Sequence, residues 1–333
     1  MIKNNSISWL KDKKNLLAFS AGGDSTALLF LLLKHNIKFD IAIVNYNIRE
    51  QSIDEVKYAQ ELATTYNFNC FIHSASNIEK NFESKAREIR YNFFEELIEK
   101  HNYENLLTAH HLGDRFEWML MQFCKGAGCV EIAGMRTIEL RDSYTIVRPL
   151  LHLDKKELLT YLQENKLKYF EDETNFDESI KRNSFRHNYS APLLDKYLDG
   201  IKKSFNYLDE DREILIPTIE IKTINNFAYF QSSNTKRGDI FYIDKYLKSK
   251  NYMLSAKERE SLKIEKTLIV GRKFIVTFYK DSILISPYFK KQITLPKEFK
   301  EKMRILKIEP KLRGYLFENQ NILELEEKLF RRV

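Results

Sequence analysis

The sequence is poor in the residues on which secreted and membrane proteins rely. It has three cysteines, Cys70, Cys124 and Cys129, an odd number without a C-x-x-C pair. This argues against disulfides and a zinc ribbon, and favours a reducing compartment. The longest apolar run, Ala27 to Leu33, is far shorter than the roughly 20 residues that span a bilayer. Residues 1–14 show no signal peptide, so we expect a cytoplasmic protein without a membrane partner.

Neither sign of charge dominates the whole chain, but its two parts differ. Residues 201–333 hold 28 Lys and Arg against 18 Asp and Glu, whereas residues 1–200 hold 26 against 29. A basic region suits a partner with a phosphate backbone, because clustered cations attract polyanions. Lysine-rich solvated surfaces are also common, so charge alone leaves nucleic-acid binding as one of two interpretations.

Glycine is scarce, with ten residues in the chain, yet two adjacent glycines stand in its organising stretch. Residues 15–35 read NLLAFSAGGDSTALLFLLLKH, a short apolar strand, a turn of small residues and an apolar helix. Such a turn can cradle phosphate, with hydroxyls from Ser20, Ser25 and Thr26 at the helix start. It is neither a Walker A loop nor a G-x-G-x-x-G turn. A turn in which Asp24 and Ser25 merely cap the helix is the alternative.

Strands and helices alternate over the first half of the chain. The expected strands are 16–19, 39–46, 69–74, 106–110 and 144–150. The expected helices are 26–34, 51–66, 83–100, 112–123 and 155–165. This alternation predicts an α/β fold with a doubly wound parallel sheet, which binds ligands at the carboxyl ends of its strands.

Two stretches at such strand ends carry polar residues. Arg49 follows the strand at 39–46, and the segment 108–117 reads TAHHLGDRFE. Asp114 and Glu117 are three residues apart, so on a helix they share a face and can grip one ammonium group. Two alternatives stay open: an acidic face that is merely solvated or capping, and a metal site that includes His110 and His111.

The loop SAGGDS at 20–25 resembles the S-G-G-x-D-S loop of the N-type (PP-loop) ATP pyrophosphatases. One family of them, the tRNA(Ile)-lysidine synthases, adds the motifs V-N-H-x-L-R, A-R-x-x-R-Y, A-H-H-x-D-D-Q-x-E-T, R-G-S-G, R-P-L-L and R-N-x-x-R. The similar segments here are VNYNIR at 44–49, AREIRY at 86–91, AHHLGDRFEW at 109–118, KGAG at 125–128, RPLL at 148–151 and RNSFR at 182–186. Any one match is weak, but their order over about the first 190 residues is hard to obtain by chance.

Among the departures from the family pattern, five need weighing. Tyr46 replaces a His, Gly113 replaces the first acid of the pair, Arg115 replaces Gln, and Trp118 replaces Thr. Ala21 stands where the family usually has a glycine, and we expect it to preserve the loop only with a negative φ. The second acid and the later Glu, which the family uses to hold lysine, are retained.

The resemblance implies an ATP-dependent ligase that forms a carbon–nitrogen bond. Its partners would be free L-lysine and isoleucine tRNA with a CAU anticodon, whose wobble cytidine becomes lysidine, so that the tRNA reads AUA instead of AUG and accepts isoleucine instead of methionine. ATP would be cut to AMP and pyrophosphate. The oligomeric state is open, with a homodimer as one option.

The resemblance also assigns roles to residues. ATP would be bound by Ser20, Ala21, Gly22, Gly23, Asp24 and Ser25. Mg²⁺ would lie near Asp24, because two anions in contact otherwise repel. Lysine would be held by Asp114 and Glu117. The candidate catalytic residues are Asp24, Arg49, Arg182 and Arg186. For the last two, ion pairs with Asp172, Glu173 or Asp177 are the alternative.

The rest of the chain predicts a different architecture. We expect a catalytic domain at 1–192, a helical linker at 193–214 and a smaller basic α+β region that binds tRNA at 215–333. A hairpin over 273–286 turns at Lys280-Asp281, and a capping box is expected at 255–258. Five aromatic side chains in this region allow two interpretations: they stack on RNA, or they form a small core. For each of the five, the core is the favoured interpretation. They are Phe274, Phe278, Tyr279, Tyr288 and Phe289.

Two rival functions remain. The first is a tRNA thiolase on the same fold, but this would need a catalytic cysteine, and only Cys124 and Cys129 are close together. The second is a tRNA-binding protein with a degenerate site, suggested by Ala21 and Gly113.

Overall fold

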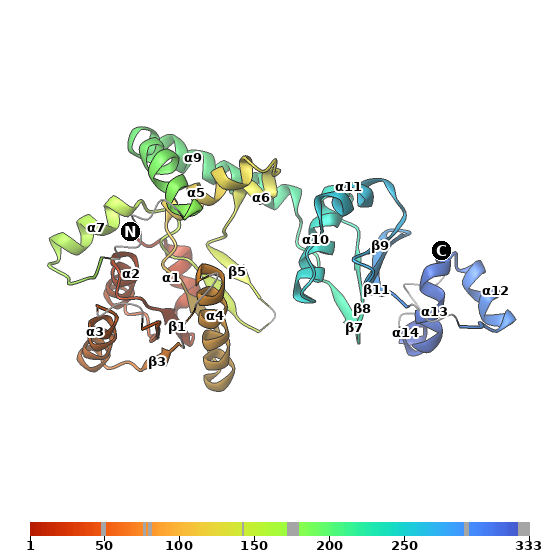
Figure 1. Cartoon of the computed structure of the whole chain (residues 1–333), viewed down its shortest axis with the longest axis horizontal. Coiled ribbons are helices and arrows are strands. Elements are labelled where there is room, and N and C mark those ends of the chain that lie inside the picture. Colours follow the sequence, from red (N-terminus) through yellow and green to blue (C-terminus); the bar gives the residue numbers. More distant parts are fainter. Residues whose placement is uncertain are drawn as a thin grey trace. The chain divides into compact units, whose positions relative to one another are not determined.

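The computed structural model describes residues 1–47, 51–75, 78, 82–141, 143–171, 180–289 and 293–325. The chain forms two compact units, Met1–Asp209 and Glu210–Val333 (Figure 1). The division falls inside one long helix, α9 (Ala191–Leu215). No helix among the described residues is long and apolar enough to cross a membrane.

The first unit is built on a mixed sheet with the strand order β3-β2-β1-β4-β6-β5. All neighbours pair in parallel except β5 and β6, which are antiparallel. The strands are β1 (Asn15–Ala18), β2 (Asp40–Asn45), β3 (Cys70–Ser74), β4 (Asn105–Leu107), β5 (Ile138–Leu140) and β6 (Thr145–Val147). The predicted doubly wound sheet is therefore confirmed, although β5 was not expected.

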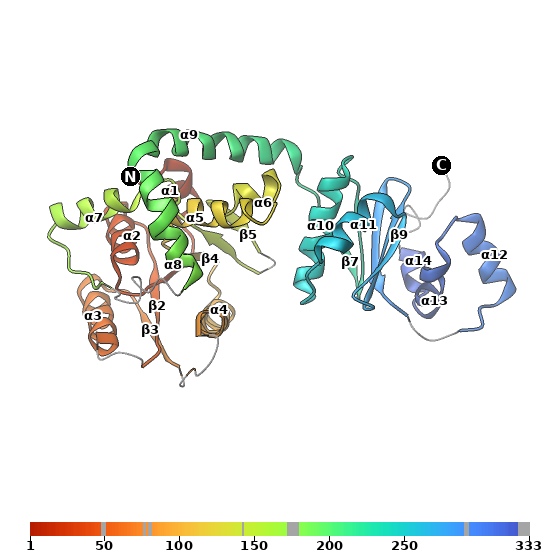
Figure 2. The same ribbon diagram turned by 45° about the horizontal axis from the view of Figure 1, so that its top comes forward.

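Helices cover both faces of this sheet, as the alternation of buried residues requires. Leu17 and Ile41 lie in the core that includes α2, α3 and α7, whereas Leu16 packs with Phe94 of α4 on the opposite face (Figure 2). The helices are α1 (Asn4–Leu10), α2 (Gly23–Lys34), α3 (Gln51–Tyr66), α4 (Phe82–His101), α5 (Leu112–Phe123), α6 (Cys129–Ala133), α7 (Lys155–Glu164) and α8 (Lys181–Phe185). A π-helical turn, Arg186–Ser190, joins α8 to α9.

The second unit contains an antiparallel sheet in the order β7-β8-β11-β10-β9. Its elements are β7 (Lys222–Ile224), β8 (Phe227–Gln231), α10 (Lys236–Ser249), α11 (Ala256–Ile264), β9 (Thr267–Val270), β10 (Phe274–Tyr279), β11 (Ser282–Pro287), α12 (Lys297–Ile305), α13 (Pro310–Glu318) and α14 (Asn321–Leu325). The expected hairpin turn lies between β10 and β11, and Ser255 and Glu258 form the expected capping box.

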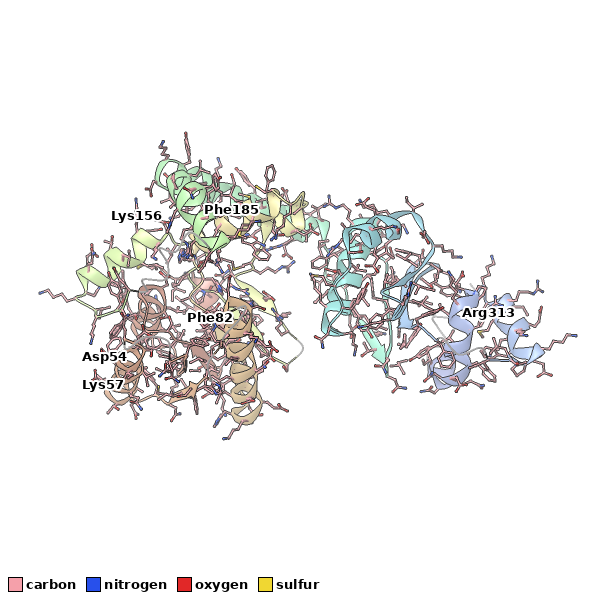
Figure 3. All side chains as sticks on the ribbon, in the orientation of Figure 1. Asp54, Lys57, Phe82, Lys156, Phe185 and Arg313 are labelled. Atoms are coloured by element: carbon pink, nitrogen blue, oxygen red, sulfur yellow. The ribbon has the colours of Figure 1, made fainter. Side chains whose placement is uncertain are left out.

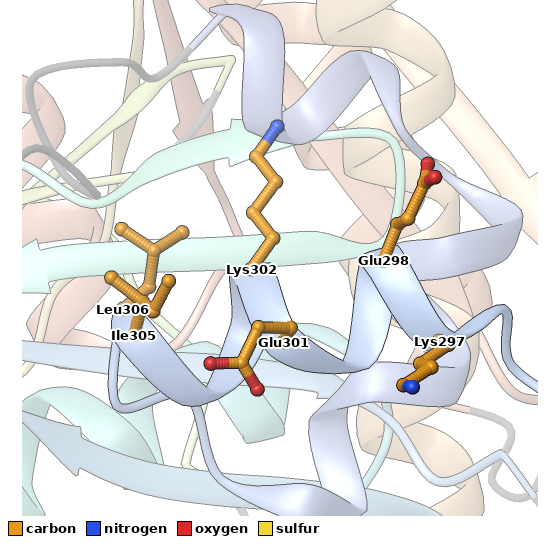
Figure 4. A pocket seen from close by; sticks show the side chains of 6 residues that line it. All are labelled: Lys297, Glu298, Glu301, Lys302, Ile305 and Leu306. Carbon is orange, nitrogen blue, oxygen red and sulfur yellow. The ribbon is translucent and has the colours of Figure 1, made fainter.

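Two layers of helices enclose the second sheet. Helices α10 and α11 lie on one face and α12 to α14 on the other (Figure 2). Arg313 of α13, labelled in Figure 3, donates to the Ile308 carbonyl oxygen and fixes the turn before its own helix. A surface hollow of about 560 Å³ follows α12 and contains none of the predicted site residues (Figure 4).

The named aromatic residues of this unit serve mainly as core. Tyr279 is buried in the core that α12 and α13 cover, and Tyr288 and Phe289 pack against it. Phe274 contacts Tyr252, with ring centroids 5.9 Å apart. The Lys236 ammonium lies 3.3 Å from the ring centroid of Phe278. The favoured interpretation, a small core, is confirmed for Tyr279, Tyr288 and Phe289; for Phe274 and Phe278 it stays a prediction.

Candidate active site

The predicted phosphate loop connects β1 to the first turn of α2. The Ser20 N–H donates to Ser25 Oγ at 3.2 Å, and the Ser25 hydroxyl donates to the Gly22 carbonyl oxygen at 3.1 Å. Ser25 therefore closes the loop on itself. Thr26 is fully buried and its Oγ1 has no hydrogen-bond partner among the described residues, so its predicted role at the phosphate stays a prediction. The first N–H groups of α2 have no partner within the helix, as at any helix start, and suit an anion.

The conformation of Ala21 differs from the expected one. Its φ is +58°, in the left-handed region that glycine favours, whereas we expected a negative value. This conformation costs an alanine about 1 kcal/mol. Two features hold it in place: the Phe170 N–H donates to the Ala21 carbonyl oxygen at 3.0 Å, and the methyl group is fully buried.

Asp24 lies in the first turn of α2, where the helix dipole favours a negative charge. Its Oδ1 is buried and accepts no hydrogen bond from any described residue. Its Oδ2 lies 3.7 Å from Nε2 of His111. A carboxylate oxygen without a partner beside a phosphate loop fits a hard cation such as Mg²⁺, which takes oxygen ligands from carboxylates and phosphates.

Helix α5 begins with a reciprocal cap that places its acids. The Gly113 N–H donates to Nδ1 of His111, and the His111 N–H donates to Asp114 Oδ2, both at 3.0 Å. As predicted, Asp114 and Glu117 share a face of this helix. Glu117 is only 1% exposed. Asp114 is thus held near the phosphate loop, since His111 Nε2 lies 3.6 Å from its Oδ2 and 3.7 Å from Asp24 Oδ2.

The two acids contact two arginines that follow them by 65 to 72 positions in the sequence. Arg182 donates to Glu117 Oε1 and, at 3.1 Å, to Asp114 Oδ1. Arg186 donates to Glu117 Oε2 at 3.0 Å and lies 3.5 Å from Asp114 Oδ1. We call these four residues the acid–arginine cluster. The predicted single face for the arginines is confirmed, and their partners include the predicted lysine-binding acids.

Burial and charge compete at both carboxylates. Burial acts to raise the pKa of Asp114, but nearby His111, His110 and Arg182 and a backbone N–H outweigh it and hold the pKa well below its usual range. Burial raises the pKa of Glu117, and the opposing effect of Arg182 and Arg186 is smaller. The cluster therefore combines a firmly ionised acid with a more easily protonated one.

His110 is a neutral neighbour of this cluster. Burial lowers its pKa to about 4, which outweighs the opposite effect of Asp114. Its Nδ1 lies 2.8 Å from the Thr108 hydroxyl. His111 lies near Asp24 as well as Asp114. Among the described residues, no group of three or more His, Cys, Asp or Glu could hold a metal ion.

Four residues named in the predictions cannot be placed, so their roles stay predictions. Arg49, Asp172, Glu173 and Asp177 fall outside the described residues. Arg148 donates to Glu139 Oε2 at 2.8 Å and to the Arg136 carbonyl oxygen at 2.9 Å, so it joins β6 to β5.

Two departures from the family pattern have structural roles. The Tyr46 hydroxyl donates to the Ala86 carbonyl oxygen at 2.9 Å and ties the end of β2 to α4, whose first residue, Phe82, is labelled in Figure 3. Arg115 is 5% exposed and pairs with Asp209 through two hydrogen bonds of 2.6 and 3.0 Å. The Arg115–Asp209 pair, which joins α5 to α9, was not foreseen, because nothing local in the sequence links these positions.

A phosphate loop at a strand end of a doubly wound sheet, with an acid in the first helical turn, defines an ATP-using protein of the PP-loop class. The PP-loop domain family matches residues 2–192, more than half of the chain. The class predicted from the loop is therefore confirmed.

Relatives with assigned names narrow this class. A tRNA(Ile)-lysidine synthase of Helicobacter pylori is 43% identical over 309 residues, which are 92% of this chain and 90% of the relative. One of Campylobacter jejuni is 40% identical over 319 residues, 96% of this chain and 97% of the relative. The chain belongs to the tRNA(Ile)-lysidine synthase family.

Among solved structures, the U34-tRNA thiolase NcsA of Methanococcus maripaludis superimposes with a TM-score of 0.53. The match covers 65% of this chain and 80% of the thiolase, at 16% sequence identity. At this identity the likeness supports the fold alone.

Proposed function

We propose that the chain joins free L-lysine to C2 of the wobble cytidine in the CAU anticodon of isoleucine tRNA, and converts ATP to AMP and pyrophosphate. The acid–arginine cluster carries the proposal, because two carboxylates on one face of α5 bind cationic groups beside the phosphate loop. The ring of His111 lies between the phosphate loop and the acid–arginine cluster, since its Nε2 is 3.7 Å from Asp24 and 3.6 Å from Asp114. The relatives named as lysidine synthases support the same reaction.

In the first step the ATP phosphates bind at the start of α2. Loop residues 20–25 provide backbone N–H groups and room for a close approach, as helix N-termini do for anions. Asp24 is the residue that would hold Mg²⁺, which would balance charge between this carboxylate and the phosphates. The cytidine O2 attacks the α-phosphate, pyrophosphate leaves, and O2 becomes a good leaving group.

In the second step the lysine α-ammonium binds at Asp114 and Glu117, so that the ε-amine is free to attack C2 and expel AMP. When the ammonium binds there, it replaces the guanidinium groups of Arg182 and Arg186 at the two carboxylates. Arg182 and Arg186 then become available to phosphate, because a planar guanidinium group can donate two parallel hydrogen bonds to two phosphate oxygens. Positive charge near the departing phosphate would stabilise the transition state.

The basic second part of the chain, with 28 Lys and Arg against 18 Asp and Glu over residues 201–333, suits the tRNA backbone. The thiolase alternative is not favoured, because Cys124 and Cys129 are separated by four residues. The relatives named above are lysidine synthases.

The test is incorporation of labelled lysine into an isoleucine tRNA transcript with a CAU anticodon, with and without ATP. A matched transcript carries U at the wobble position. We expect label only with ATP and only on the C-containing RNA. Label on both RNAs would refute the base assignment. RNA binding without label would refute the ligase and leave a tRNA-binding protein with a degenerate site.

A further inference from the structure

The ring of His111 lies between two carboxylates from different parts of the chain. Its Nε2 is 3.7 Å from Asp24 Oδ2 in the first turn of α2 and 3.6 Å from Asp114 Oδ2 in the first turn of α5. Both distances exceed those of a hydrogen bond, so the ring is hydrogen-bonded to neither acid. The side chains of His111 and Asp114 are 7% and 13% exposed, so water screens these charges weakly.

The helix cap determines which ring nitrogen carries the proton. A backbone N–H, that of Gly113, donates to Nδ1 of His111 at 3.0 Å. Nδ1 is therefore an acceptor without a proton, and the proton of the neutral ring is on Nε2. This N–H is directed toward the gap between the two carboxylates, which would otherwise face each other as like charges.

Gly113 provides the space that this arrangement needs. A Cβ atom at position 113 would lie 2.7 Å from Cε1 and 3.0 Å from Nδ1 of His111. Any side chain there would displace the ring. The family pattern has an acid at this position, so the placement of the His111 ring is tied to a departure from that pattern.

We propose that His111 is a positioning residue that orients the carboxylates of Asp24 and Asp114 through the electrostatic attraction of one shared Nε2–H, which lies beyond hydrogen-bond distance of both. The ring thereby couples the phosphate loop to the cation-binding acids. This inference rests on the proposed function and extends it, since it assigns one side chain to the orientation of acids at both the ATP site and the lysine site. It predicts that displacing the ring weakens ATP and lysine binding together.

Two variants remove the Nε2–H from its place in different ways. His111→Asn retains an oxygen that can cap α5 but is too short to reach Asp24. Gly113→Ala retains the histidine and displaces its ring, while alanine is the better helix former. We expect each variant to raise KM for both ATP and lysine about three- to tenfold, the range for one weak polar contact to a charged group. The Tm of Gly113→Ala should not fall below that of wild type by more than a degree or two.

Two further variants separate positioning from stability. Gly200→Ala, on α9, is the matched glycine control, because a Cβ there meets nothing within 4 Å. It should leave both KM values unchanged. His111→Gln places an amide N–H near the position of Nε2 but loses the cap. We expect it to lower Tm and to recover part of both KM values relative to His111→Asn.

Calorimetric titration keeps this test separate from that of the proposed function. The full chain is titrated with lysine and with a non-hydrolysable ATP analogue plus Mg²⁺. If wild type makes no lysidine, the proposed function fails, and weaker binding of both ligands to His111→Asn and Gly113→Ala still supports the positioning role. Wild-type affinity for both ligands in those two variants, or weaker binding of one ligand only, overturns it.

Discussion

The phosphate loop and the acid–arginine cluster meet at His111, but they are built in opposite ways. The loop is six consecutive residues closed by backbone and hydroxyl hydrogen bonds, such as Ser20 N–H to Ser25 Oγ. The cluster is held by four formal charges that come from α5 and from the segment after residue 180. A local turn can thus be specified by its own residues, whereas a charge cluster depends on distant elements that pack correctly. A substitution in the acid–arginine cluster should therefore lower stability and activity strongly, and a substitution in the phosphate loop only slightly.

The largest effect is expected for Glu117→Gln. This change removes the charge that pairs with both Arg182 and Arg186 and leaves Asp114 to balance two guanidinium groups. Breaking a buried pair costs about 3 kcal/mol or more, and the partial exposure of the arginines reduces this to about 2 kcal/mol. Lysine ligation should fall by about 100-fold or more.

Urea denaturation and the lysine-incorporation assay measure the two effects of Glu117→Gln. The matched control is Glu96→Gln on α4, whose side chain is exposed, and which should change the free energy of unfolding by less than about 0.5 kcal/mol. Equal behaviour of the two variants would show that the cluster is not the stabilising feature described here.

A second prediction concerns pH. Because burial lowers the pKa of His110 from 6.5 to about 4, the unfolded chain binds a proton at this residue between those pH values and the folded chain does not. The contribution of His110 to the free energy of unfolding therefore falls as pH decreases through this window, by about 2 kcal/mol at pH 5 relative to pH 7. Asp114 adds no dependence there, since its depressed pKa matters only at lower pH.

His110→Gln should flatten this part of the pH dependence. Urea titrations at pH 7, 6 and 5 measure the slope. An unchanged slope in His110→Gln would mean that this histidine is not held neutral by burial.

A third, smaller effect is expected for Asp209→Asn. The variant removes the charge that pairs with Arg115 but retains an acceptor oxygen, and Asp209 is 39% exposed. We expect a loss of about 1 kcal/mol in the free energy of unfolding and no change in ligation, because the pair is outside the acid–arginine cluster.

Asp195→Asn is the control for this pair. It removes an ion pair with Lys156, labelled in Figure 3, in which both side chains are largely exposed. Urea denaturation should show no measurable change. A loss of ligation in Asp209→Asn would extend the functional site to α9.

The smallest effect is expected in the loop itself, for Ala21→Gly. Glycine removes the strain at φ +58° but also loses a buried methyl group and increases the entropy of the unfolded chain, and each term is about 1 kcal/mol. One gain opposes two losses, so the free energy of unfolding should fall by about 1 kcal/mol at most, with ligation retained. A larger loss of stability or activity, measured as above, would show that the alanine has a specific role.

Much of the first unit could be predicted from sequence, because its signals are local. Apolar strands alternate with helices, the small residues of loop 20–25 specify the turn, and the three-residue spacing of Asp114 and Glu117 places both on one helical face. Short edge elements gave weaker signals. Strand β5 has only three residues, and α12 and α13 lie among lysines that conceal their buried positions, such as Met303 and Leu312.

The features of the site that the sequence did not predict depend on tertiary contacts. The pairing of Arg182 with Glu117 spans 65 residues, and no local pattern identifies the partner of either. The conformation of Ala21 could not be predicted from local sequence either, since its positive φ depends on the contact with Phe170, far along the chain. The role of His111 was hidden because its neighbour His110 looks alike in sequence, and only the Gly113 cap distinguishes them.

The most direct test of the central claim is the effect of Asp114→Asn on the two KM values. Asparagine retains an oxygen for the helix cap but removes the charge that would hold the lysine ammonium. We predict that KM for lysine rises about 30-fold or more, the cost of a lost charge-assisted contact, while KM for ATP changes by less than about threefold. An equal rise in both values, or no rise for lysine, would contradict the assignment of this cluster as the lysine site.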